Sequence, residues 1–197
     1  MEEAVKKTNW TQSISYIVIM ILITETVFLI KQNKELKTTI KEMTASSIIE
    51  PLQPGERVEP VKIQSLDKKI SELTYNEPQK KTLLFIFSTT CPHCEKNLPM
   101  WKSLVEHNNS NQCDVIGISI HQVDKTFDYV SSRNVNFITY SVSSDTSFSR
   151  KYKISGVPET VLLNGLGIVE KTWSGELTQE HTMEIQKLMS TSQAVSN

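Results

Sequence analysis

The sequence predicts an α/β sandwich, in which helices cover a central mixed sheet, preceded by a membrane-spanning helix. Two apolar runs of strand length, at 83–87 and 115–120, lack polar alternation, as expected for strands buried on both faces. A segment with helical spacing of its apolar residues follows each run. Near the start of the chain, residues 14–30 are apolar over almost the length that a helix needs to cross a bilayer.

Composition limits the classes of protein to which the chain can belong. Its 197 residues leave room for one ordinary domain and some additional segments. The net charge of -1 gives no electrostatic reason to expect nucleic-acid binding. Three cysteines are too few for a scaffold held together by disulfides. A close pair of cysteines in such a chain is typical of a redox motif rather than of a structural bridge.

The membrane anchor is predicted over residues 14–30, after an N-terminal tail of residues 1–13. Glu25 interrupts the apolar run, and a carboxylate within a span costs a few kcal/mol, so we place it near an interface of the bilayer. The alternatives for Glu25 are a protonated side chain or contact with a partner helix. The residues after Ile30 contain no small-x-small cleavage site, which favours an uncleaved anchor over a removed signal peptide.

A connector of residues 31–54 is expected to continue the helix as a solvated stalk, until prolines break regular structure. Residues 55–190 then alternate strand and helix patterns, and a tail of residues 191–197 follows. Strands are predicted at 58–63, 70–73, 83–87, 115–120, 137–140, 160–163 and 168–173, and helices at 92–107, 127–133, around 148–152 and at 178–189.

The chemistry centres on the CPHC segment from Cys91 to Cys94, which lies where a buried strand passes into a helix. The unpaired N–H groups and the positive end of the helix dipole at this position favour a thiolate, the reactive form of cysteine. Pro99 lies inside the same predicted helix. Pro158, just before a later strand, is a candidate for a cis peptide bond.

The order of these features resembles the thioredoxin fold: a strand, the cysteine pair, a helix containing a proline, a long alternating middle, Val157-Pro158 and a final hairpin. With the anchor and stalk, the chain is similar to the membrane-tethered thioredoxin-like proteins of the TlpA, ResA and DsbE type. The similarity covers roughly residues 55–190. The Pro-His dipeptide between the cysteines is similar to that of the oxidase DsbA.

The resemblance implies catalytic roles for four residues. Cys91 would be the exposed attacking cysteine and Cys94 the buried resolving cysteine, so the Cys91–Cys94 disulfide would carry the electrons without a further cofactor. Pro158 would face this disulfide. His93 would act by hydrogen bonding or positive charge near the Cys91 sulfur. No metal is expected, because a zinc site needs four ligands and no second Cys or His pair has suitable spacing.

The implied substrates are cysteines of other proteins. Val157 would offer its backbone to an extended substrate peptide by strand addition, with Thr90 and Pro92 beside the same groove. A membrane-bound or extracytoplasmic protein would exchange electrons with the cysteine pair. The Pro-His dipeptide favours an oxidant and the anchored family favours a reductant, so both directions of electron transfer stay open. The sequence predicts no particular oligomeric state.

Three positions depart from the patterns of these families. Thr90 stands where thioredoxins have Trp, and Phe85 stands where they carry a buried acid on the strand leading to the first cysteine. Asn97 replaces the Glu that ResA-like proteins have three residues after the second cysteine. The proton of Cys94 would then pass to Glu95, to a water molecule or to a residue from elsewhere in the chain.

Charge and chemistry predict opposite orientations for the anchor. Four lysines within residues 31–41 outnumber Lys6 and Lys7, and a simple positive-inside count would place the domain in the cytoplasm. Long domains can translocate against such a bias. Because disulfide chemistry belongs to oxidising compartments, we predict a single-pass protein of the cell membrane whose thioredoxin-like domain is extracytoplasmic.

Cys113 and His121 lie outside the CPHC segment and have separate predictions. Cys113 is interpreted as a partly buried bystander just before a strand rather than as a third redox thiol. His121 ends a strand on the side where α/β sites form, which makes it a candidate neighbour of the site.

The functional alternatives are a non-catalytic module that holds copper or a partner cysteine, and an accessory protein of the MauD type for maturing one enzyme.

Overall fold

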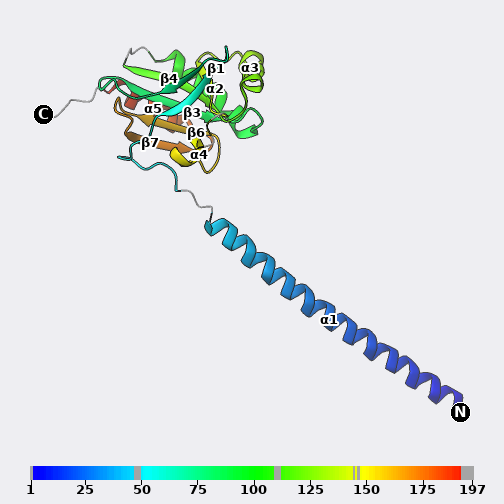
Figure 1. Cartoon of the computed structure of the whole chain (residues 1–197). Helices are drawn as coiled ribbons and strands as arrows, with labels where there is room; N and C mark the ends of the chain where they lie inside the picture. The colour runs from blue at the N-terminus through cyan, green and yellow to red at the C-terminus, as the bar shows by residue number, and fades with distance from the viewer. Residues whose placement is uncertain (1, 47–49, 109–111, 144, 146, 192–197) are drawn as a thin grey trace. The chain divides into compact units, whose positions relative to one another are not determined.

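The computed structural model describes residues 2–46, 50–108, 112–143, 145 and 147–191 (Figure 1). The chain divides into two units, Met1–Ile48 and Ile49–Asn197, which are described separately. The described residues of the first unit form the helix α1 (Glu2–Ser46). This helix covers the predicted anchor and most of the predicted stalk, while residues 47–49 of that stalk lie outside the described residues.

The apolar part of α1 is a candidate membrane span by its length and composition. It runs over Gln12–Glu35, 24 residues, and so extends beyond the predicted 14–30 at both ends. Thr24 and Thr26, the two hydroxyl residues that interrupt the apolar run, each donate a hydrogen bond of 2.7 Å to a backbone carbonyl one turn earlier. Because polar groups in lipid need internal partners, these bonds make both threonines compatible with a span.

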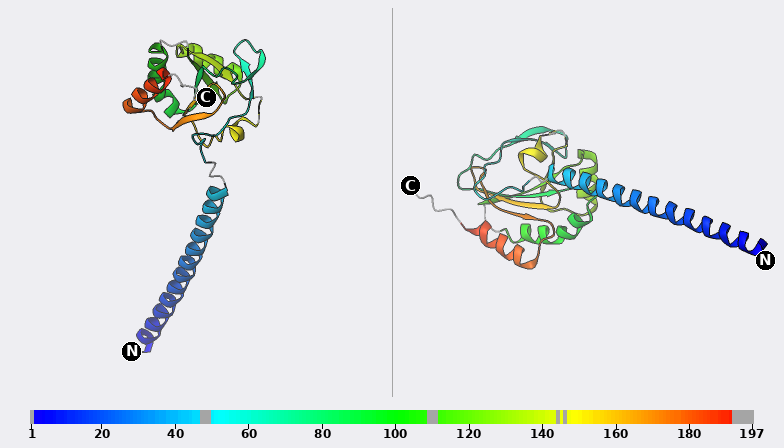
Figure 2. Two further views of the ribbon diagram at one scale, coloured as in Figure 1. Left: turned by 90° about the vertical axis from the view of Figure 1, so that its left-hand side faces the viewer. Right: turned by 90° about the horizontal axis from the view of Figure 1, so that it is seen from below.

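The second unit is built on a seven-stranded mixed sheet with the order β2-β1-β5-β4-β3-β6-β7 (Figures 1 and 2). The three central strands β3, β4 and β5 are parallel, and β6 and β1 join them on either side in antiparallel pairing. The strands are β1 (Val61–Ser65), β2 (Ile70–Leu73), β3 (Lys81–Phe87), β4 (Cys113–Ser119), β5 (Ile138–Ser141), β6 (Glu159–Leu163) and β7 (Val169–Ser174). The helices are α2 (Pro92–Glu106), α3 (Val123–Ser132), α4 (Phe148–Lys151) and α5 (Gln179–Ser190).

The structure confirms the predicted order of strands and helices and corrects several boundaries. β1 begins at Val61, three residues later than predicted. β4 begins two residues earlier than predicted, and its first residue Cys113 pairs with Lys81, so this cysteine lies inside the strand and not before it. α3 begins four residues earlier than predicted, because its first turns already bury Val123 and Thr126.

The central strand β3 is buried along its whole length, as predicted for a strand covered on both faces. Its side chains alternate between two hydrophobic clusters. The cluster on one face includes residues of α2, α3 and α5, and the cluster on the other face includes residues of α4 and of the segment 52–58. α2 and α5 lie alongside each other on the first of these faces (Figure 2).

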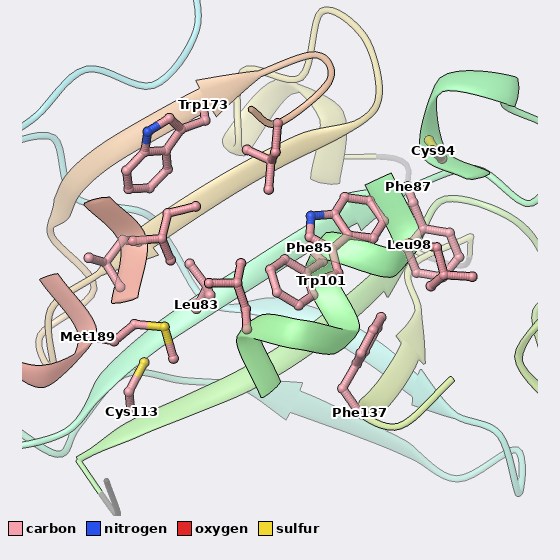
Figure 3. Packing of buried hydrophobic residues seen from close by; sticks show 14 of the residues in the cluster. Leu83, Phe85, Phe87, Cys94, Leu98, Trp101, Cys113, Phe137, Trp173 and Met189 are labelled. Atoms are coloured by element: carbon pink, nitrogen blue, oxygen red, sulfur yellow. The ribbon is translucent and has the colours of Figure 1, made fainter. Parts of the chain in front are cut away.

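Aromatic packing attaches α2 to the sheet. The rings of Phe85 and Trp101 stack with centroids 5.0 Å apart and planes at 15°, and Phe137 meets Phe85 edge-on at 5.2 Å (Figure 3). Trp101 Nε1 also donates a hydrogen bond of 3.1 Å to Thr160 Oγ1 on β6. An ionised acid at position 85 would lose its hydration inside this aromatic cluster, whereas Phe85 packs within it.

Replacing Phe85 with Ala should lower the free energy of unfolding by about 3–5 kcal/mol, because it removes a buried aromatic ring and leaves a cavity beside Trp101. The measurement is chemical denaturation of the full chain in detergent, followed by tryptophan fluorescence. Phe127→Ala is the matched control, since this ring is 52% exposed and its loss should change stability by less than about 1 kcal/mol. Equal losses in the two variants would contradict this account of the core.

Candidate active site

Cys91 lies at the start of α2, directly after the turn that follows β3. It is the N-cap residue, with φ of −89° and ψ of 115°, and its Sγ accepts a hydrogen bond of 3.4 Å from the Cys94 N–H. Pro92 fits the first helical turn, since the N–H that it lacks would have no partner within the helix. Cys91 is half-buried between the exposed residues Thr90 and Pro92. The Cys91 sulfur therefore lies at the positive end of the helix dipole.

Cys94 occupies a different environment, although it is only one helical turn away. Its side chain is fully buried, in the same cluster as Leu98 and Trp101 (Figure 3). Burial disfavours the thiolate and raises the pKa of the Cys94 thiol to about 12, although a backbone hydrogen bond involving Ser88 acts in the opposite direction. Both thiols are free in this structure. The Cys91 thiol is reachable from solvent, whereas the Cys94 thiol is shielded from solvent and protonated.

The start of β6 lies beside the reachable thiol. The Val157–Pro158 peptide bond is cis, as predicted. The Cys91 thiol donates a hydrogen bond of 3.4 Å to the Val157 carbonyl, and the Pro158 carbonyl accepts one of 2.9 Å from the Gly175 N–H. The structure therefore brings together residues 91 and 157, which are 66 positions apart in the chain.

The His93 ring is held by a residue that the sequence analysis did not consider. Its Nδ1 lies 2.5 Å from Oε1 of Glu176, in the loop between β7 and α5. The same oxygen accepts a hydrogen bond of 2.9 Å from Lys96 Nζ. Hydrogen bonds from His93 and Lys96 hold the pKa of the Glu176 carboxyl below its usual value. His93 thus hydrogen-bonds to Glu176, and its expected action on the Cys91 sulfur, by hydrogen bonding or positive charge, stays a prediction.

Asn97 has a structural role at the position where the resemblance expects an acid. The side chain is 1% exposed. Its Nδ2 donates to the Gly175 carbonyl at 3.0 Å, and its Oδ1 accepts from the Leu177 N–H at 2.8 Å. Asn97 thus fastens to α2 the two residues that flank Glu176.

His121 contacts the turn that leads to Cys91, as expected for a neighbour of the site. Its Nδ1 lies 2.5 Å from Thr89 Oγ1, and its Nε2 lies 3.4 Å from Ser88 Oγ. Its backbone carbonyl accepts a hydrogen bond of 2.5 Å from Ser141 Oγ on β5. These contacts tie the turn before Cys91 to the carboxyl ends of β4 and β5.

Glu159 is a buried acid that the sequence analysis missed. It is 2% exposed, and its Oε1 has no hydrogen-bond partner within the described part of the chain. Burial raises the pKa of the Glu159 carboxyl to about 7. Side chains alternate along β6, so Glu159 shares a face with Val161, opposite the face that carries Leu162 and Cys94. The sequence signal for this buried acid was its position between Pro158 and the apolar run that follows.

The remaining candidates lie away from the buried thiol or pair elsewhere. Glu95, considered as a proton acceptor, forms an ion pair with Arg133 on the surface. Cys113 is buried at the start of β4, at the end of the core opposite to Cys94 (Figure 3), and burial raises the pKa of its thiol to about 12. Within the described residues, no group of three or more His, Cys, Asp or Glu side chains could hold a metal ion.

Comparisons with known proteins agree with this geometry. Residues 79–169, which include both cysteines and Pro158, match a family model described as thioredoxin-like. The chain is 27% identical over 108 residues to the sporulation thiol-disulfide oxidoreductase A of Bacillus subtilis, covering 53% of this chain and 66% of that protein. It is 22% identical over 135 residues to the thiol-disulfide oxidoreductase ResA of Halalkalibacterium halodurans, covering 68% of this chain and 76% of that protein.

Solved structures show the same fold. The crystal structure of StoA from Bacillus subtilis superposes with a TM-score of 0.55 at 20% identity, over 68% of this chain and 98% of that one. The thiol:disulfide interchange protein DsbE from Chlorobium tepidum gives a TM-score of 0.60 at 14% identity, over 70% of this chain and 96% of that one. The domain therefore has the thioredoxin fold that the resemblance predicted.

Replacing Glu159 with Gln should raise the free energy of unfolding at pH 8 by up to about 3 kcal/mol. A carboxyl whose pKa rises from 4.5 to about 7 on folding binds more protons in the folded state, so stability falls as pH rises through that window. The variant should lack this part of the fall when denaturation is measured between pH 4.5 and 8. Glu72→Gln, on the exposed edge strand β2, is the control and should keep the wild-type pH dependence.

Proposed function

We propose that this chain, a thioredoxin-like protein related to ResA and to the sporulation thiol-disulfide oxidoreductase A, exchanges disulfides with protein cysteines outside the cytoplasm while anchored in the membrane. One observation carries the proposal. A reachable thiol, Cys91, caps a helix beside the backbone of Val157, and a second thiol, Cys94, lies buried one turn further on. This arrangement separates an attacking cysteine from a resolving one.

The reaction passes through a mixed disulfide. In the reducing direction, the Cys91 thiolate attacks a substrate disulfide, and a Cys91–substrate bond forms as the first substrate sulfur leaves. Cys94 then loses its proton and attacks Cys91 Sγ, which releases the second substrate sulfur and leaves the Cys91–Cys94 disulfide. The substrate gains two electrons and the cysteine pair loses them. The oxidising direction is the reverse.

Residues around Cys91 shape the substrate groove. The Val157 carbonyl, which accepts a hydrogen bond from the Cys91 thiol, is free to accept one from the backbone of an extended peptide once that thiol has reacted. Pro158 lies next to it at the start of β6. Thr90 and Pro92 are exposed and flank Cys91 on the solvent side.

Because Cys94 is buried, resolution of the mixed disulfide is more demanding than the first attack by Cys91. Attack uses the half-buried thiol of Cys91, whereas resolution needs a proton to leave the Cys94 thiol, whose pKa is about 12. The nearby positive charge of a protonated His93 would favour the Cys91 thiolate and so make the disulfide more oxidising. The protein that exchanges electrons with the pair is a membrane-bound or extracytoplasmic dithiol or disulfide.

The location follows from the anchor and from the chemistry. The candidate span Gln12–Glu35, long and apolar enough to cross a bilayer, supports a single-pass anchor in the cell membrane. An oxidising compartment suits a cysteine pair that must cycle through a disulfide, which favours the extracytoplasmic side for the domain. The lysines that follow the span act against this orientation, but a long domain can translocate against such a bias.

Cys94→Ala should trap mixed disulfides between Cys91 and substrate proteins in cells, because the resolving thiol is gone. They should be visible as adducts on non-reducing gels and absent from Cys91→Ser. A single dominant adduct would indicate a dedicated partner, and a ladder would indicate general disulfide formation. Cys113→Ser in the Cys94→Ala background should leave the adducts unchanged, since Cys113 is 3% exposed. Absence of adducts would favour a non-catalytic module that binds thiols or copper.

Fusion of reporter enzymes after residue 191 should show the domain outside the cytoplasm. An alkaline phosphatase fusion, active only after export, should give signal, and a β-galactosidase fusion at the same position should not. The control is a fusion within the first 9 residues, before the span, which should give the opposite pattern. The same pattern at both positions would contradict a single-pass topology, and exchanged patterns would place the domain in the cytoplasm.

A further inference from the structure

We infer that Glu176 is a positioning residue for His93, and that the pair handles the proton exchanged with substrate thiols at Cys91. The inference rests on the proposed function and adds a specific role for a loop far away in the sequence. Its basis is the contact of 2.5 Å between His93 Nδ1 and Glu176 Oε1, which joins positions 83 residues apart. Neither residue is buried, so the contact depends on how the chain holds the loop.

The loop 175–177 between β7 and α5 is fixed at two points. Asn97, 1% exposed, bonds the Gly175 carbonyl at 3.0 Å and the Leu177 N–H at 2.8 Å, on both sides of Glu176. The Gly175 N–H donates to the Pro158 carbonyl at 2.9 Å. The loop thus spans from α2 to the start of β6, which are the two parts of the chain that meet at Cys91.

Backbone geometry at residue 175 supports this placement. Gly175 has a φ of +87°, a left-handed conformation that side chains other than glycine rarely adopt. The turn lets the chain leave β7, bond to the Pro158 carbonyl and present Glu176 toward the start of α2. The position of the carboxylate is therefore set by backbone bonds and not only by a surface ion pair.

The contact assigns different roles to the two nitrogens of His93. A carboxylate at Nδ1 favours the proton on Nδ1, so Nε2 carries the lone pair whenever the ring is neutral. Among the described residues Nε2 has no hydrogen-bond partner, and the side chain is 63% exposed. Nε2 is thus the nitrogen available to accept a proton from an incoming thiol and to return it later, which is general acid–base catalysis.

The oxidising reaction transfers two electrons from a substrate dithiol to the Cys91–Cys94 disulfide. A substrate thiol gives its proton to His93 Nε2, its sulfur bonds to Cys91 Sγ, and the Cys91–Cys94 bond breaks with its electron pair on Cys94 Sγ. A second substrate thiol then bonds to the first substrate sulfur and releases Cys91. The substrate dithiol loses two electrons and two protons, and the cysteine pair gains them. The Cys91–Cys94 disulfide of this chain is the oxidant, so a single turnover needs no other reagent.

The test uses the full chain in detergent with its Cys91–Cys94 disulfide formed, mixed with a synthetic dithiol peptide, and follows disulfide loss by alkylation and mass. We expect Glu176→Ala to slow the reaction about tenfold at pH 7, less than usual for acid–base catalysis because the pair is exposed. Glu176→Gln keeps an acceptor for Nδ1–H and should lose about threefold. Glu180→Ala, which removes an exposed acid in the first turn of α5, should match wild type.

Two readouts separate positioning from a mere structural effect. Adding Glu176→Ala to His93→Ala should cause no further slowing, because the two act as one unit. The ratio of wild-type to Glu176→Ala rates should fall toward one above about pH 9.5, where the substrate thiol is already ionised and needs no base. A tenfold loss that persists at high pH, or that adds to His93→Ala, would overturn the inference, as would a Glu176→Ala rate equal to wild type. If the wild-type chain forms no Cys91–Cys94 disulfide or leaves the peptide reduced, the proposed function fails instead.

Discussion

The stacking of Trp101 on Phe85 fixes α2 against the central strand, and the positions of both cysteines follow from it. A helix held at its middle by an aromatic pair and by the Trp101–Thr160 hydrogen bond has its first turn fixed as well. That turn buries Cys94 in the same cluster and leaves Cys91 at the helix start, where amides face it. The difference between the two thiols is therefore a consequence of packing.

The same packing explains the residues that depart from the related families. Phe85 and Asn97 stand where acids are expected, and each is committed to structure: one to the aromatic stack, the other to the loop 175–177. An ionised acid at position 85 would be costly in this core. The chain thus lacks the expected carboxylates beneath Cys94 and carries an acid at the exposed edge of the site, at Glu176.

Short-range sequence patterns predicted those features of the fold that neighbouring residues determine. The buried strand β3, the helix after Cys94 and the cis bond before Pro158 follow from short-range signals, and the structure has them. The early start of α3 was missed because burial of Val123 depends on its tertiary neighbours. The contact of His93 with Glu176 and the burial of Glu159 could not be foreseen, since each depends on residues brought together only by the folded sheet.

Solvent access divides the proton chemistry of the site into two parts. Cys94 is buried among apolar groups and its pKa is about 12, so the structure favours its protonated form at rest and resists ionisation within the core. At the exposed edge, His93 and Glu176 lie in water, where protons exchange freely. The cysteine that meets substrate lies at the start of α2, while the thiolate of Cys94 has to form within the apolar core. Ionisation of Cys94 is therefore the demanding part of resolution, and the exposed edge governs the steps in which substrate sulfur joins or leaves Cys91.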